Sequence, residues 1–300
     1  MNTAAERSLS RKVVERASSG RRTKDLMFRL ALLFSTSVGF VVLAVLVIDV
    51  LLDGGSRVSL DFITSPPSRI SPERTGVAPA LLGTIYLMVL CAVFIVPVGV
   101  ATAVYLEEYA DRDSRLSRLI EVNIQNLAAV PSVVYGILGL AFIVRGPLGL
   151  KPVLLAGALT LGLLVLPVVI IVSREAIRAV PSSIREGSLA LGATQWQTIW
   201  KQVLPSALPG IATGVILALS RAVGETAPLL VIGAATFLLF SPDGLGSRFT
   251  AMPLLIFEFI SDADTDLRAA GAAAILVLLA LLVVMNAGAI FLRNRYERKW

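Results

Sequence analysis

Long apolar runs, with little alternation of apolar and polar residues, dominate this chain. A helix that crosses a hydrocarbon core needs about 20 predominantly apolar residues, and backbone groups in lipid must be satisfied within the segment, so the runs predict membrane-spanning helices. No segment alternates over about ten residues, as the strands of a membrane barrel would. The runs cover residues 30–52, 77–106, 122–144, 153–172, 207–240 and 269–292.

The fifth run is the ambiguous one, because 34 residues would extend for about 50 Å as one helix and Pro228 interrupts them. Short cytoplasmic loops carry the excess of Lys and Arg. Six spans with the N-terminus inside place 18 Lys and Arg on the inner side and seven on the outer side. We therefore expect one span over 207–231, both termini in the cytoplasm, and residues 249–260, which are too short to cross, along the outer surface.

Composition agrees with an integral membrane protein. The 300 residues are 56% hydrophobic with a mean hydropathy of +0.80, which is more apolar surface than one soluble core of this size hides. Residues 1–27 are basic and lack an apolar run, so they predict a disordered cytoplasmic tail ahead of a transmembrane domain over 28–300. The expected fold class is all-α with six transmembrane helices. The net charge of +6 follows from the tail and inner loops, and nucleic-acid binding is not needed to explain it.

The inventory of reactive side chains excludes several chemistries. The chain has one cysteine, Cys91, within an apolar run, and no histidine, so it offers no disulfide, no Cys/His metal cage and no histidine base. It also lacks the G-x-x-x-x-G-K-S/T loop that binds nucleotide phosphates. We therefore expect neither enzymatic activity nor a cofactor or metal bound by this chain.

Residues 181–205, between the fourth and fifth spans, predict two short helices. Ser183 stands three residues before Glu186, and Thr194 stands three before Gln197, which is the spacing of a capping box at a helix start. Gly192 lies between them and predicts a left-handed residue that ends the first helix. We expect the second helix to end at Pro205.

The second of these helices carries an apolar stripe, formed by Trp196, Ile199, Trp200 and Val203. Such a stripe either lies in the lipid headgroups or docks into a groove of another protein.

Two carboxylates, Glu107 and Glu108, follow the second apolar run and open a loop that contains three arginines. We expect a solvated charge cluster that anchors the end of a helix. The arginines are Arg112, Arg115 and Arg118.

The 181–205 segment resembles the EAA loop of bacterial ABC importer permeases of the MetI-like fold, which reads E-A-A, three residues, G, nine residues, I-x-L-P. The chain keeps the glutamate, the glycine and the Leu-Pro at the right spacing, but has Gly and Ser for the two alanines and Gln202 for the isoleucine. In that family the loop is the coupling helix that fits a cleft on the ATP-hydrolysing subunit. The residues implied in coupling are Glu186, Gly187, Ser188, Gly192, Leu204 and Pro205.

Segments 60–86, 97–110, 130–141 and 220–230 are similar in order to PstA-type permease subunits of phosphate importers, from about residue 60 to the end of the chain. The resemblance implies a bacterial inner-membrane complex with a homologous PstC-type permease, two PstB-type ATP-binding subunits and an external PstS-type phosphate-binding protein. ATP and Mg²⁺ would be held by the partner subunits.

Arg221 and Glu225 stand four residues apart within the fifth run. An arginine in a membrane span is costly, so it faces protein or water. One interpretation is an internal ion pair that fixes two helices. The other, which the resemblance favours, is a pathway site in which Arg221 binds a phosphate oxyanion, Glu225 holds or recaptures the guanidinium, and Thr226 adds a hydroxyl. Permeases for molybdate or sulfate, and a passive channel or membrane scaffold, are the alternative functions.

Overall fold

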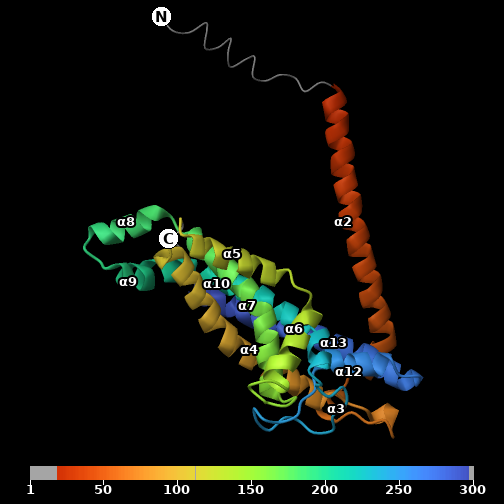
Figure 1. Cartoon of the computed structure of the whole chain (residues 1–300). Coiled ribbons are helices and arrows are strands. Elements are labelled where there is room, and N and C mark those ends of the chain that lie inside the picture. The colour runs from red at the N-terminus through yellow and green to blue at the C-terminus, as the bar shows by residue number, and fades with distance from the viewer. Residues whose placement is uncertain (1–18, 112, 297–300) are drawn as a thin grey trace, which may run out of the picture. The chain divides into compact units, whose positions relative to one another are not determined.

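The computed structural model of the chain describes residues 19–111 and 113–296. Within these ranges every regular element is helical, as the fold class predicts. The chain divides into two compact units, Met1–Leu52 and Asp53–Trp300 (Figure 1). Of the expected disordered tail over residues 1–27, the part up to residue 18 lies outside the described residues, whereas residues 19–27 are helical.

The described part of the first unit, residues 19–52, belongs to α2, Ser19–Gly54, which contains the first predicted span. Its sequence is apolar on every side between residues 30 and 52, as expected of a helix that faces lipid or other spans all round. The 34 residues from Lys24 to Arg57 are long and apolar enough to cross a membrane.

Four helices of the second unit meet the same requirement, so the described residues hold five spans in all. The first joins α4, Ala78–Val104, to the π-helical turn η3, Tyr105–Tyr109, and the second is α7, Leu154–Arg178. The third, Gln195–Val223, comprises α9, Gln195–Thr198, the π-helical turn η5, Ile199–Val203, and α10, Leu204–Val223. The fourth lies in α13, Thr265–Tyr296.

The predicted third span, 122–144, is not one straight helix. It is divided between α5, Arg115–Ala128, and α6, Ser132–Leu138, which continues into the π-helical turn η4, Gly139–Val144. The two parts meet at 106°, so a sixth span exists only if the bent pair is counted as one. Pro131 lies at the bend, where its ring removes a backbone donor and disfavours helical geometry in the residue before it.

The helix α7 lies at the centre of the second unit and packs against α4 and α10 (Figure 1). Small residues allow this approach: a Cβ on Gly99 of α4 would lie 2.7 Å from Val169, and one on Gly214 of α10 would overlap with Val172. The main apolar core forms between these helices, and its fully buried members include Leu87, Cys91, Ile95, Leu161, Val165 and Val169.

A second apolar core includes residues of α3, Leu60–Thr64, α12, Met252–Ile260, and α13. The short 3-10 turns η1, Gly55–Arg57, and η2, Pro72–Arg74, contact α13 and hold no buried residue. Residues 249–260 were expected to be too short to cross and to lie along the outer surface. They are not among the candidate spans of the described residues, and Met252, Leu255 and Phe259 are buried. The apolar helix α12 packs against α13 and α4, and this packing removes its apolar side chains from solvent.

The predicted fifth span, 207–231, ends early. The helix α10, Leu204–Val223, stops before Gly224, and α11, Ala227–Val231, is a separate short helix. Pro228 lies in the first turn of α11, where the missing backbone donor costs nothing.

We predict that Gly83→Ala destabilises the second unit, because the new Cβ would overlap with the backbone carbonyl oxygen of Thr250. Overpacking of this kind costs about 1–3 kcal/mol. The thermal midpoint can be followed by a fluorogenic maleimide, since Cys91 is the only cysteine of the chain and is buried. Gly39→Ala, with no atom within 4 Å of its Cβ, is the control and should leave the midpoint unchanged. Equal midpoints for both variants would contradict the packing argument.

Candidate functional site

The first helix of the 181–205 segment is α8, Ser182–Ala190. Its N-cap is Pro181, with extended backbone and no side-chain cap, so the capping box predicted at Ser183 and Glu186 is wrong. Proline restricts the residue before it to extended geometry, which ends α7 and lets the new helix begin directly after the ring. Glu186 is therefore left exposed on α8.

The turn after α8 forms as predicted. Gly192 has a φ of 85°, its backbone N–H donates to Leu189 at 2.9 Å, and Ala193 donates to Ser188 at 3.2 Å. These two bonds are those of a Schellman motif, which satisfies carbonyls that a helix end leaves free.

The second helix of the segment does not stop at Pro205. The capping box of Thr194 and Gln197 is confirmed at the start of α9, Gln195–Thr198, which continues through the π-helical turn η5, Ile199–Val203, into α10. In η5 the backbone N–H of Leu204 reaches Ile199, five residues back, and this wider turn gives the ring of Pro205 room that a regular helix would deny. Residues 195–223 thus form one continuous helix.

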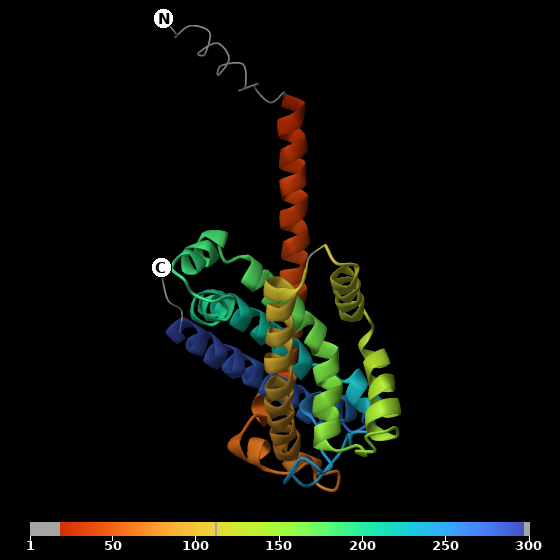
Figure 2. The same cartoon turned by 60° about the vertical axis from the view of Figure 1, so that its left-hand side comes forward.

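The 181–205 segment presents exposed apolar side chains. Leu191 at the turn is 91% exposed, and Trp196 and Trp200 are exposed in edge-to-face contact with ring centroids 5.3 Å apart. No residue of α8 is buried. Both views show α8 and α9 extending away from α4 and α7 (Figure 1, Figure 2). Exposed apolar groups at the tip of a projecting hairpin are suited to docking.

Behind this hairpin, the carboxylate of Glu107 joins two spans. Its side chain is 1% exposed, and it accepts hydrogen bonds from Arg174 at 2.9 Å and from Arg178 at 2.8 Å. Arg174 also pairs with Glu121 of α5 at 3.2 Å. The pairs tie η3, at the end of α4, to the last two turns of α7 and to α5.

The neighbouring Glu108 holds both arms of the hairpin. Its carboxylate accepts from Arg185 of α8 at 2.8 and 3.0 Å, and its backbone oxygen accepts from the side chain of Gln195 in α9. Arg185 donates further to the carbonyls of Ile177 and Val180 at the end of α7, at 2.8 and 2.6 Å.

These pairings were not predicted from the sequence. Glu107 and Glu108 were expected in a solvated cluster with Arg115, Arg118 and Arg112, the last of which lies outside the described residues. The partners observed among the described residues include arginines of α7 and α8, about 70 residues further along the chain. The available signal was the four-residue spacing of Arg174 and Arg178 at the end of an apolar run, which places two arginines on one helix face.

The pair of Arg221 and Glu225 lies at the end of α10. Arg221 Nε is 3.5 Å from Glu225 Oε1, and the two side chains are 58% and 17% exposed. They were expected on one face of a continuous span, but the helix ends between them and leaves Glu225 in the loop before α11. Thr226 directly precedes α11 and is half-buried. The guanidinium is thus accessible at the surface of the chain, while the carboxylate is recessed behind it.

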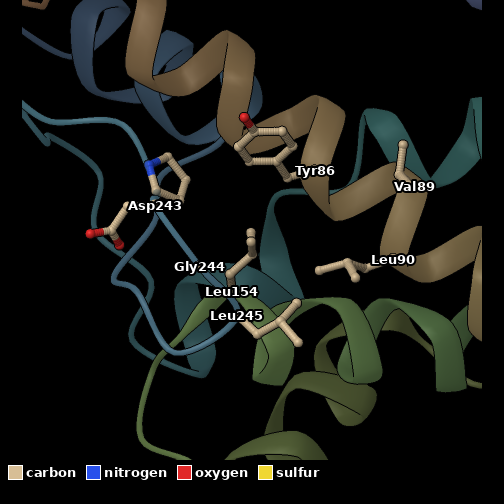
Figure 3. A pocket seen from close by; sticks show the side chains of 8 residues that line it. Tyr86, Val89, Leu90, Leu154, Asp243, Gly244 and Leu245 are labelled. Carbon is tan, nitrogen blue, oxygen red and sulfur yellow. The ribbon is translucent and has the colours of Figure 1, made fainter.

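A hollow of about 320 Å³ lies between α4 and the 242–245 loop (Figure 3). None of the described residues that line it is basic, and Tyr86 and Asp243 are its only polar side chains. Asp243 accepts a hydrogen bond from Ser247 of its own loop, which lowers the pKa of this exposed carboxyl. With no cation among these lining residues, the hollow does not suit an anion.

Solved ABC transporters share this fold. A chain of a bacterial alginate importer superposes with a TM-score of 0.66 and 16% identity, covering 94% of this chain and 98% of the other. A chain of the MetNI methionine transporter gives 0.57 and 20% identity, covering 74% and 95%. At such identities the likeness shows the fold alone, and it confirms the MetI-like arrangement. The fold is therefore the all-helical one of these ABC transporter chains.

Residues 95–298 match the family described as "Binding-protein-dependent transport system inner membrane component", and the chain belongs to this family. It is a multi-pass inner-membrane subunit that is not itself catalytic, and the family implies an ATPase and a binding protein as partners. Phosphate transport system permease protein PstA 1 of Mycobacterium tuberculosis is 38% identical over 226 residues, 74% of this chain and 72% of that protein. Probable ABC transporter permease protein YqgI of Bacillus subtilis is 36% identical over 187 residues, 62% and 63% of the two chains.

We predict opposite effects for two glycines of the hairpin, at each of which an added Cβ would meet no atom within 4 Å. Gly192→Ala forces a left-handed alanine, a strain of about 1 kcal/mol, and should loosen the end of α8. Gly187→Ala, inside α8, should strengthen the helix by a similar amount. Amide hydrogen exchange over residues 182–198, in the full chain in lipid nanodiscs, should be faster in the first variant and slower in the second. The same change in both would contradict the role of the turn.

Proposed function

We propose that this chain is a permease subunit of an ATP-driven importer of inorganic phosphate. It would act beside a homologous PstC-type permease, two PstB-type subunits that bind ATP and Mg²⁺, and an external PstS-type phosphate-binding protein. The relatives named PstA, which match about three quarters of the chain, support the cargo and these partners. The observation that carries the proposal within the chain is the accessible guanidinium of Arg221 beside Glu225.

The geometry of Arg221 suits a passing oxyanion. A guanidinium binds phosphate oxygens with a fork of donors, and its charge does not depend on pH in the physiological range. The recessed carboxylate of Glu225, 3.5 Å away, competes for the same guanidinium. Exchange between carboxylate and phosphate keeps the affinity moderate, which transport requires because the anion must also leave. Thr226, next to Glu225, supplies a further hydroxyl donor.

The 181–205 segment would be the ATPase-coupling element, with Glu186, Gly187, Ser188, Gly192, Leu204 and Pro205 as its coupling residues. Its exposed Leu191, Trp196 and Trp200 support docking into a protein groove over burial in headgroups, since they sit at the tip of a projecting hairpin. Coupling would place the segment and both termini in the cytoplasm, in line with the excess of Lys and Arg there. Closure of the ATPases would move the helices and open the path around Arg221 to the outside, and hydrolysis would reset it.

Another oxyanion, such as molybdate or sulfate, is the second candidate cargo, because Arg221 would attract any of these anions. The YqgI relative, which is 36% identical, is named without a cargo. Competition for uptake separates the candidates. A passive channel or scaffold has no support, since the chain belongs to a family of binding-protein-dependent permeases.

We predict that Arg221→Gln reduces phosphate uptake at least about a hundredfold, as loss of a charge-assisted phosphate contact of roughly 3 kcal/mol implies. Uptake of labelled phosphate by proteoliposomes that contain the assembled importer and its binding protein measures this. The four subunit types should still co-purify.

Arg118→Gln, which removes an exposed arginine of α5, is the matched control and should transport normally. Arg221→Lys keeps the charge but loses the fork, so intermediate uptake is expected. Normal uptake by Arg221→Gln would reject the pathway role. Uptake that molybdate or sulfate suppresses better than phosphate would reassign the cargo.

We predict that the double variant Glu186→Ala, Gly192→Ala loses at least about tenfold in affinity for the ATPase subunits, because it removes an exposed charge and reshapes the turn. Co-purification of the ATPase with the tagged chain, titrated in detergent, measures the loss. Glu175→Ala removes an exposed carboxylate from α7 outside the segment and should retain the ATPase. Equal binding by the two variants would rule out this docking face.

A further inference from the structure

Glu108 lies where three elements meet. Its carboxylate accepts two hydrogen bonds from Arg185 in α8, at 2.8 and 3.0 Å, and its backbone oxygen accepts one from Gln195 in α9. The backbone oxygen is free for this contact because it belongs to the last turn of a helix, whose carbonyls lack intrahelical partners. Both arms of the projecting hairpin are therefore attached to a single residue at the end of the α4 span.

Arg185 also connects α8 to α7. Its guanidinium donates to the carbonyls of Ile177 at 2.8 Å and Val180 at 2.6 Å, which lie at and just beyond the C-terminal end of α7. A cation is favoured there by the unsatisfied carbonyls of the helix end. One side chain thus contacts the hairpin, α7 and, through Glu108, α4.

Polar contacts make up most of the attachment of α8. None of its residues is buried, and the half-buried Ile184 is the member of α8 that packs against the apolar cluster around Val180 and Val203. Ser188 and Thr198 lie within hydrogen-bond distance, 2.9 Å, and join α8 to the second arm of the hairpin, which continues into α10. Arg185 is therefore the side chain of α8 that makes hydrogen bonds to the ends of both α4 and α7.

The adjacent Glu107 makes α4 and α7 move together. Its buried carboxylate binds Arg174 and Arg178 of α7, and separating these groups would leave an uncompensated charge inside the protein, which is strongly unfavourable. The π-helical turn η3, which carries both glutamates, is of a kind found frequently at functional positions.

We propose that Glu108 and Arg185 form the joint through which movement of the hairpin is transmitted to the α4 and α7 spans. They are positioning residues of the transport cycle: they contact neither cargo nor nucleotide, and they set the angle between the docking hairpin and the bundle. This inference rests on the proposed coupling role of residues 181–205. It adds two residues, Glu108 and Arg185, that are not among the coupling residues proposed for that segment.

The test compares Glu108→Gln and Arg185→Gln with wild type in the reconstituted importer with its loaded binding protein. Both variants should keep the ATPase subunits bound, because Glu186 and Leu191 are untouched, and should keep hydrolysing ATP. Cargo moved per ATP should fall about tenfold, within the range typical of coupling between sites. Arg185→Lys retains a charge and donors for the carbonyls, so it should recover part of the loss. Arg118→Gln, which removes an exposed arginine of α5, should behave as wild type.

A second measurement is independent of cargo and of the ATPase. Spin labels at Leu189 of α8 and Val98 of α4, both exposed, are placed in the full chain with Cys91→Ala and studied in nanodiscs. The distribution of distances should be narrow with Glu108 present and broad in Glu108→Gln. An unchanged distance distribution would contradict the proposed role of Glu108 and Arg185. Unchanged cargo moved per ATP, or loss of the ATPase from the Glu108→Gln complex, would contradict it as well. If phosphate fails to stimulate the wild-type importer, the proposed cargo is wrong, and the label distances still decide the joint.

Discussion

The buried contact of Glu107 with Arg174 and Arg178 is the interaction on which the arrangement of the second unit depends. A carboxylate that is almost fully enclosed requires its partners, and here two arginines one helical turn apart supply them. The contact fixes the ends of α4 and α7 relative to each other. The apolar packing of these two helices, with its close approach at Gly99, sets the distance between them. The ion pairs add contacts between specific residues at their ends.

The same end of the bundle supplies two routes from the hairpin into the membrane. One passes through Arg185 and Glu108 to α4 and α7. The other is the unbroken helix from Gln195 to Val223, whose first turns lie in the hairpin and whose last turn carries Arg221. The π-helical turn η5 makes this second route possible, since it lets the helix pass Pro205 without a break. In the proposed importer, Trp196 and Trp200 of the docking face and the residue that meets the anion thus lie on one continuous helix.

Much of this architecture could be predicted because it follows from local constraints. Gly192 and the Thr194 capping box were predicted correctly, since a turn and a cap depend on residues within one helical turn of each other. The start of α8 was predicted wrongly because Pro181 competes with Ser183 for the same role. The partners of Glu107 and Glu108 were missed because about 70 residues separate them, and any of several arginines satisfied the charge pattern equally well.

The sequence was enough to predict that the protein is a membrane protein of the all-helical class, because hydrocarbon forces every spanning backbone to satisfy its own hydrogen bonds over a fixed length. It also located the hairpin between two apolar runs. The tertiary structure alone decided which helices bend, end or continue. The 106° bend at Pro131, the end of α10 between Arg221 and Glu225, and the continuity across Pro205 each depend on how a proline or glycine is accommodated by neighbouring helices. Those neighbours are distant in the chain, and their contacts are set by packing, which a one-dimensional pattern does not record.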